Sequence, residues 1–224
     1  MKLLSTVSIL SIALASAPAF ADDHKTAYTS PAPVVSSIRD WSGAYVGLGL
    51  SYSMGSYSTG GTAYQAADAD GMGVSGLLGY SWQEGAFVYG AEIMANLDNA
   101  SGTAAGCGLG APATCQSKVE NYVAARVRVG YAFDDTLLFA TLGVASDRQR
   151  QAVLGLGGGN SDSIRHTGVG IGLGVEQALS DKLSVRGDIE YYQYSSETYN
   201  LAIPGPTTVR PATMTARISL VNRF

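Results

Sequence analysis

The segment from residue 161 to residue 166 holds the residue types of a nucleophilic active site. His166 follows Asp162 by four positions, and Ser161 and Ser163 flank that aspartate. A serine nucleophile needs a histidine base within hydrogen-bond reach and an acid that orients the base. Proximity along the chain does not supply that geometry, so a solvated loop histidine is the competing interpretation. An enzyme with a site near His166 is therefore kept only as an alternative hypothesis.

A second group of residues could form ion pairs or line a pore. Eight charged side chains fall within segments that are otherwise built of small and apolar residues. They are Glu92, Arg126, Arg128, Glu176, Arg186, Asp188, Glu190 and Arg217. Acids and arginines are equally represented, so each charge can find an opposite partner, and a desolvated arginine–carboxylate pair is a strong contact.

Cys107 and Cys115 are the two cysteines of the chain and lie in a stretch rich in Gly, Ala and Pro. In an oxidising compartment, two cysteines this close predict a small loop-closing disulfide. A metal site is the competing interpretation, but two cysteines without a neighbouring histidine provide too few ligands.

Two glycine-rich stretches resemble phosphate-binding loops only formally. Residues 71–76, GMGVSG, match G-x-G-x-x-G, but a strand pattern follows them where a dinucleotide site needs a helix. Residues 155–160, GLGGGN, lack the Lys-Ser/Thr of a phosphate loop and predict a flexible loop tip. Neither stretch predicts a cofactor.

The N-terminus carries an export signal. Lys2 precedes the apolar run from Leu3 to Ala15, and Ala19-Phe20-Ala21 forms an A-x-A cleavage site. This pattern predicts a signal peptide over residues 1–21. Residues 22–39 are polar, contain two prolines and predict a periplasmic N-terminal linker. The net charge of −4 argues against a nucleic-acid partner, which would need clustered basic residues.

From residue 40 onward, apolar residues alternate with small or polar ones. The alternation recurs in eight segments, near residues 44–54, 72–82, 87–97, 122–131, 137–145, 168–176, 183–192 and 214–220. A period of two residues predicts strands. The four alternating glycines of GVGIGLGVE, residues 168–176, then form one face of such a strand.

Connections between these segments alternate in length. Short turns are expected near residues 83–86, 134–136 and 179–182, and long polar loops near 56–71, 98–118, 146–166 and 195–211. Short turns at one end and long loops at the other are typical of an outer-membrane barrel, which also has an even strand number. The sequence thus predicts an all-β fold, an eight-stranded antiparallel up-and-down transmembrane β-barrel over residues 40–224.

The eight charges decide which face of the strands meets lipid. All of them share the glycine and serine face, and a lipid-facing arginine near the midplane costs roughly 2–4 kcal/mol. We therefore expect the charges to point into the barrel, where paired charges fill a narrow lumen more readily than they line a channel. The apolar face then contacts outer-membrane lipid, which makes a soluble periplasmic barrel the less favoured fold.

DWSGAYVGLGLSYS, residues 40–53, closely resembles the opening of the opacity-protein-like, OmpA-type eight-stranded outer-membrane barrels, especially the alphaproteobacterial major surface antigens. Residues 127–145 and 179–194 resemble the central strand-turn-strand and the seventh strand of that family. The resemblance implies the outer membrane of a Gram-negative bacterium, no cofactor, and a C-terminal Phe224 recognised by the barrel-assembly machinery. Asn222 departs from the aromatic or large apolar residue that the family usually has two positions before this phenylalanine.

These observations predict a non-catalytic role in envelope integrity or surface contact, with possible extracellular ligands on the long loops. A narrow porin-like channel for ions or small solutes is the first alternative. An outer-membrane enzyme with a rim site near His166 is the second.

Overall fold

The computed structural model describes residues 38–155, 160–202 and 205–224. The predicted signal peptide, residues 22–37 of the predicted linker and residues 156–159 of the predicted loop tip lie outside the described residues. No helix among the described residues is long and apolar enough to cross a membrane.

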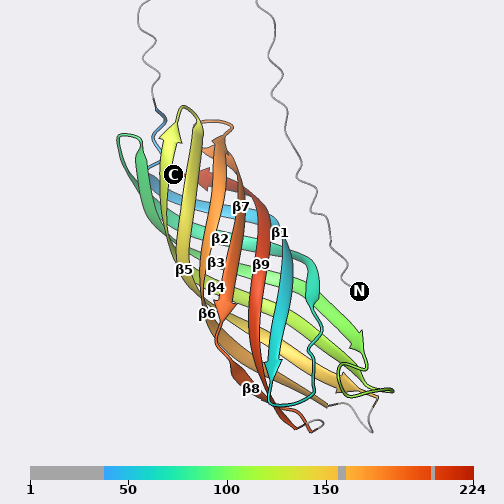
Figure 1. Cartoon of the computed structure of the whole chain (residues 1–224). Helices are drawn as coiled ribbons and strands as arrows, with labels where there is room; N and C mark the ends of the chain where they lie inside the picture. The colour runs from blue at the N-terminus through green and yellow to red at the C-terminus, as the bar shows by residue number, and fades with distance from the viewer. Residues whose placement is uncertain (1–37, 156–159, 203–204) are drawn as a thin grey trace, which may run out of the picture. The chain divides into compact units, whose positions relative to one another are not determined.

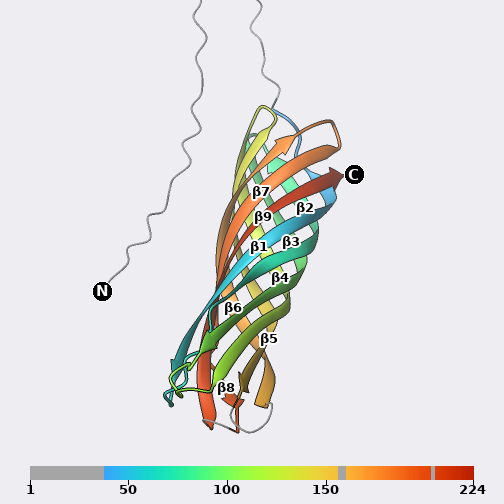
Figure 2. The ribbon, with the colours of Figure 1, turned by 90° about the vertical axis from the view of Figure 1, so that its right-hand side faces the viewer.

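The described chain forms one closed antiparallel sheet (Figures 1 and 2). Its strands are β1 (Gly43–Gly60), β2 (Ala69–Glu84), β3 (Phe87–Ala105), β4 (Thr114–Phe133), β5 (Thr136–Leu154), β6 (Asn160–Ala178), β7 (Leu183–Tyr194), β8 (Glu197–Asn200) and β9 (Pro206–Arg223). Each strand from β1 to β6 pairs with the next, β7 pairs with β9, and β9 pairs with β1 to close the ring. The short β8 pairs with β9 beyond the end of β7, so the nine strands occupy eight positions in the wall. The predicted eight-stranded barrel is confirmed.

Strands extend much further toward the long-loop end than the sequence predicts. β3 and β4 are separated only by residues 106–113, where a loop over 98–118 is expected, and β5 continues to Leu154 through the loop expected over 146–166. The prediction of these loop boundaries is wrong because strands outside the membrane need no apolar outer face. Polar residues such as Arg148 and Ser163 occupy the outward positions there, so the apolar alternation fades while the backbone ladder continues.

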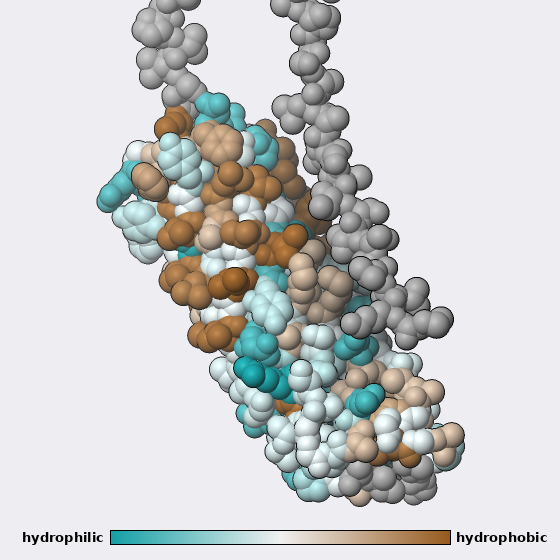
Figure 3. All heavy atoms as spheres, in the orientation of Figure 1, coloured by the Kyte–Doolittle hydropathy of each residue, from teal (hydrophilic) through white to brown (hydrophobic). Residues whose placement is uncertain are grey.

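Side chains that point outward form an apolar band around the half of the barrel that carries the short turns (Figure 3). On β5 this apolar band runs from Leu138 to Val144, and on β6 from Val169 to Val175. We call the part of the barrel beyond the apolar band, including the connections at that end, the outer extension; on β5 it comprises residues 146–154, and on β6 residues 160–167. An outward apolar band flanked by aromatic residues is what a lipid bilayer requires of a barrel.

The alternating glycines of β6 face the lumen. A Cβ atom added to Gly170 would collide with the ring of Tyr192, and one added to Gly174 would collide with the ring of Phe139. The rings come from the neighbouring strands β7 and β5. The bare face of β6 therefore makes room for large side chains in a barrel whose interior is narrow.

Candidate functional site

The lumen at the level of the apolar band holds a concentrated set of charges. Glu92 is on β3, and two arginines are on β4. The other members are Glu176 on β6, three residues of β7, and Arg217 on β9. All eight charges expected to point inward are buried: Glu92, Arg126, Arg128, Glu176, Arg186, Asp188, Glu190 and Arg217. We call this set, together with Arg223, the lumen charge network.

Glu92 is the centre of the lumen charge network. Its carboxylate accepts hydrogen bonds from Arg126 Nε at 2.7 Å, Arg128 Nη1 at 3.2 Å and Arg186 Nη1 at 2.6 Å. The Tyr45 hydroxyl donates a fourth at 2.6 Å. One carboxylate thus contacts three guanidinium groups and orients them relative to each other.

A second group of ion pairs lies between β7 and β9. Arg217 Nη1 is 2.6 Å from Asp188 Oδ2 and 3.1 Å from Glu190 Oε2, and its Nη2 donates to the Tyr122 hydroxyl at 2.6 Å. Arg126 also contacts Glu190, which links this group to Glu92. Pairs connect every member, so no carboxylate or guanidinium of the set is left without an opposite charge.

Arg223 is a fifth arginine in the lumen that the sequence reasoning missed. Its Nη2 is 3.4 Å from Glu176 Oε1, which also accepts a hydrogen bond from Ser184 at 2.7 Å. Arg223 has the same parity as Arg217, six residues earlier on β9. Extending the alternation to the end of the chain would have found it.

The mouth of the barrel at the short-turn end is filled by Trp41, just before β1. Its side chain is fully buried and packs with Val88, Ala132, Leu137 and Phe139. Two hydrogen bonds hold the main chain of Trp41 in place. Trp41 N donates to Gln83 Oε1 at 2.6 Å, and Trp41 O accepts from Arg223. The sequence places Trp41 in a family motif but does not reveal that it plugs the lumen.

The outer extension has a small core of its own. The predicted disulfide is present, with 6.0 Å between the Cα atoms of Cys107 and Cys115. It packs in one buried cluster with Tyr64, Tyr199 and Leu201. Residues of the β1–β2 connection therefore contribute to this core.

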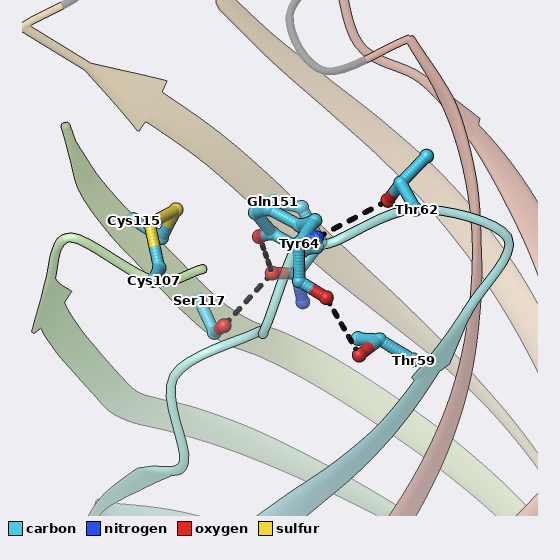
Figure 4. Close-up of a disulfide and its surroundings, with 7 residues drawn as sticks. All are labelled: Thr59, Thr62, Tyr64, Cys107, Cys115, Ser117 and Gln151. Atoms are coloured by element: carbon cyan, nitrogen blue, oxygen red, sulfur yellow. Dashed lines mark hydrogen bonds between the residues drawn. A yellow bond between two sulfur atoms is a disulfide. The ribbon is translucent and has the colours of Figure 1, made fainter. Parts of the chain in front are cut away.

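Tyr64 points from that connection into the lumen (Figure 4). Its hydroxyl donates to Gln151 Oε1 at 3.0 Å, and Ser117 donates to the same oxygen at 2.8 Å. Backbone N of Gln65 also donates to Cys107 O at 3.0 Å, which ties the connection to the disulfide loop. The lumen is thus filled at this end as well.

His166 does not form a catalytic triad with the serines near it. Its ring is fully buried inside the outer extension, with Nε2 2.8 Å from the Tyr199 hydroxyl and Nδ1 3.0 Å from Ser195 O. Ser161 and Ser163 have the opposite parity on β6 and are exposed on the outside. Neither the solvated histidine nor the rim site is found, because β6 already begins at Asn160.

Burial shifts the pKa values of two side chains in the outer extension. It raises the pKa of the Asp147 carboxyl to about 7, and it lowers the pKa of the His166 imidazole. Asp147 and His166 face each other in the β5–β6 ladder. Across the three described stretches of chain, no group of three or more His, Cys, Asp or Glu side chains is placed to hold a metal ion.

Comparison with known proteins agrees with this architecture. The profile of the outer membrane protein beta-barrel domain family matches residues 7–224. The chain is 31% identical over 214 residues to a 25 kDa outer-membrane immunogenic protein of Brucella canis, covering 94% of this chain and 92% of that protein. It is 27% identical over 161 residues to a 22 kDa outer membrane protein of Rhizobium leguminosarum bv. viciae, covering 72% and 68%.

Among solved structures, the outer membrane protein OprG from Pseudomonas aeruginosa has a similar fold. The TM-score is 0.55 at 12% identity, with 82% of this chain and 96% of OprG covered. The resemblance seen in residues 40–53 is confirmed by the relatives. The chain therefore belongs to the outer membrane protein beta-barrel domain family and is an outer-membrane protein of the surface-antigen kind.

Proposed function

We propose that the protein is a closed, non-catalytic barrel that presents its outer extension at the cell surface and adds a rigid element to the outer membrane. The contact between Arg186 on β7 and Glu92 on β3 carries this proposal. These strands lie four positions apart in the ring of eight, on opposite walls. Side chains that meet across the lumen favour a blocked interior over an open pore.

Two further features support a closed barrel over the narrow porin-like channel. Trp41 fills the mouth at the short-turn end, and Tyr64 fills the lumen beside Gln151 at the other. A conducting barrel would need all three obstructions to move. Each is held by several hydrogen bonds or by tight packing.

The outer extension supports a surface role. Its disulfide packs with Tyr64, Tyr199 and Leu201 in one buried cluster, and this packing restrains the loops at that end of the barrel. The Brucella canis relative is named for being immunogenic. Extracellular ligands of the loops are part of this proposal, since rigid scaffolds commonly carry binding loops.

The C-terminal strand supports recognition by the barrel-assembly machinery. Phe224 is 74% exposed and points outward at the end of β9. Replacing Phe224 with Ala should lower the amount of folded protein in the outer membrane, whereas refolding into detergent micelles should be unchanged. Equal membrane levels of the two proteins would count against this role.

Ion and solute flux tests the closed barrel. The folded protein, inserted in vesicles loaded with a chloride-sensitive dye, should give no more chloride entry than empty vesicles. A general-diffusion porin inserted at the same density serves as the positive control. Chloride entry that rises with the amount of inserted protein would establish the channel instead.

A further inference from the structure

Four basic residues gather on the outside of the barrel just beyond the apolar band. Lys118 is on β4, Arg148 and Arg150 are on β5, and Arg165 is on β6. The three arginines are exposed, and Lys118 is partly exposed. We call these four residues the outer basic patch; they lie on three strands that neighbour each other in the sheet.

Strand register places these cations directly opposite each other. Lys118 faces Arg150 in the β4–β5 ladder, and Arg148 faces Arg165 in the β5–β6 ladder. Like charges in directly opposed positions destabilise a sheet. Two such pairs side by side are stabilised when an anion lies between them.

Acidic residues of the same strands neutralise only part of the outer basic patch. β4, β5 and β6 contain four acids: Glu120, Asp147, Asp162 and Glu176. Glu120 forms an ion pair with the patch, with its Oε2 3.6 Å from Arg148 Nε, and Asp147 interacts electrostatically with Arg165. Asp147 and Glu176 are buried, and the Asp162 carboxylate accepts backbone N–H groups of Ser163 and Asn200.

The basic charge is confined to one side of the outer extension. Among the residues that the structure describes, Arg210 on β9 is the one other outward-facing lysine or arginine beyond the apolar band. On the β2 side, the exposed charges at this end are Asp68 and Asp70. A chain of net charge −4 thus presents a local positive surface.

The height of the outer basic patch matches a lipid headgroup layer. Arg148 follows Val144, where the apolar band ends on β5, by four positions, and Arg165 precedes Val169, where the band begins on β6, by four. At ~3.4 Å per residue and a tilt of ~45°, four residues correspond to about 10 Å along the membrane normal. Long arginine side chains can reach back over that distance to the interface.

We propose that the outer basic patch binds the phosphate groups of phosphorylated lipids in the outer leaflet. Arginine guanidinium groups bind phosphate through two parallel N–H donors, and two opposed pairs offer space for more than one phosphate. Bound phosphate removes the repulsion within each pair. The lipid then stabilises the outer extension at the membrane surface.

Native mass spectrometry of the folded protein in dodecyl maltoside micelles tests the proposal, with diphosphoryl lipid A and fully dephosphorylated lipid A as probes. The double substitution Arg148→Gln/Arg165→Gln should weaken binding of the diphosphoryl form about 30-fold, at ~1 kcal/mol per cation. Binding of the dephosphorylated form should not change. The matched control Arg210→Gln/Lys182→Gln removes two exposed cations outside the patch and should keep wild-type affinity.

Heat-modifiable migration on a gel verifies folding of each variant, and Lys118→Gln/Arg150→Gln provides a second test of the same patch. The proposal is overturned if wild type binds the two lipids equally, or if the control double variant loses as much affinity as the patch variants. Retention of wild-type affinity by both folded patch variants would also overturn it.

Discussion

Arg186 Nη1 on β7 lies 2.6 Å from Glu92 Oε1 on β3, and the two strands are on opposite walls of the barrel. The same glutamate holds two arginines of β4. One buried carboxylate therefore connects three strands, and its removal leaves three buried arginines that each retain a contact with a remaining carboxylate but lose the one they share.

Glu92→Gln should lower the free energy of unfolding by about 3–5 kcal/mol, because it neutralises a buried carboxylate that three buried arginines share and leaves an excess of buried positive charge. Urea unfolding in detergent micelles, followed by heat-modifiable migration, measures this loss. Glu84→Gln is the matched control: Glu84 is at the end of β2, where its carboxylate accepts a hydrogen bond from the Tyr89 hydroxyl at 3.3 Å. The control should change stability by less than about 0.5 kcal/mol. Equal stability of Glu92→Gln and wild type would refute a structural role for the lumen charge network.

Trp41→Ala should destabilise the barrel by about 3–5 kcal/mol, because it empties a packed site beneath Val88 and Leu137. The same unfolding measurement reports it. Trp82→Ala is the comparison, since Trp82 lies on the outside and is 47% exposed. If Trp41→Ala costs no more than Trp82→Ala, the plug at the short-turn mouth is not important for stability.

These residues also separate what the sequence predicts from what it cannot. Alternation places Glu92 and Arg186 on the inward face because lipid excludes charge from the other face. The inward or outward direction of a residue does not predict which charged side chains form ion pairs, since that depends on the stagger of the strands and on side-chain length. The position of Trp41 cannot be predicted, because its side chain packs against residues of strands that are distant in the sequence. The full length of β5 cannot be predicted either, because Arg148 and Arg150 occupy outward positions where apolar residues would indicate a strand. The burial of Trp41 in the barrel mouth and the length of the outer extension are therefore known only from the structure.

Cys107→Ser/Cys115→Ser should loosen the outer extension while the membrane-spanning part remains intact. The closed loop is short, with a sequence separation of 8, so the expected loss of stability is about 2–3 kcal/mol. Limited proteolysis of the folded protein should show new cleavage within residues 106–113. Unchanged protection of this segment would mean that the Tyr64 cluster holds it without the disulfide.

Asp147→Asn should stabilise the barrel at pH 8 and have little effect at pH 4. The pKa of Asp147 is raised from 3.8 to about 7 in the folded protein, so the folded state binds the proton more tightly than the unfolded state. The contribution of the protonated carboxyl to stability is complete below pH ~4 and is lost as pH rises through about 7. A shift of this size corresponds to about 4 kcal/mol.

The lowered pKa of His166 acts in the opposite direction, since it favours folding above the unfolded histidine pKa and disfavours it as pH falls. The stability difference between Asp147→Asn and wild type, measured by urea unfolding at several pH values, cancels this contribution. A difference that does not grow between pH 4 and pH 8 would contradict the assignment to Asp147.

Single-channel recording in a planar bilayer tests the closed lumen most directly. Insertion of wild-type protein should give no stepwise conductance, although recovered protein migrates as the folded form. A variant that removes all three obstructions together, Glu92→Ser/Arg186→Ser/Trp41→Ala/Tyr64→Ala, should give discrete conductance steps when its migration on a gel shows that it is folded. Stable stepwise conductance by the wild-type protein would contradict a closed barrel and establish an ion-conducting pore.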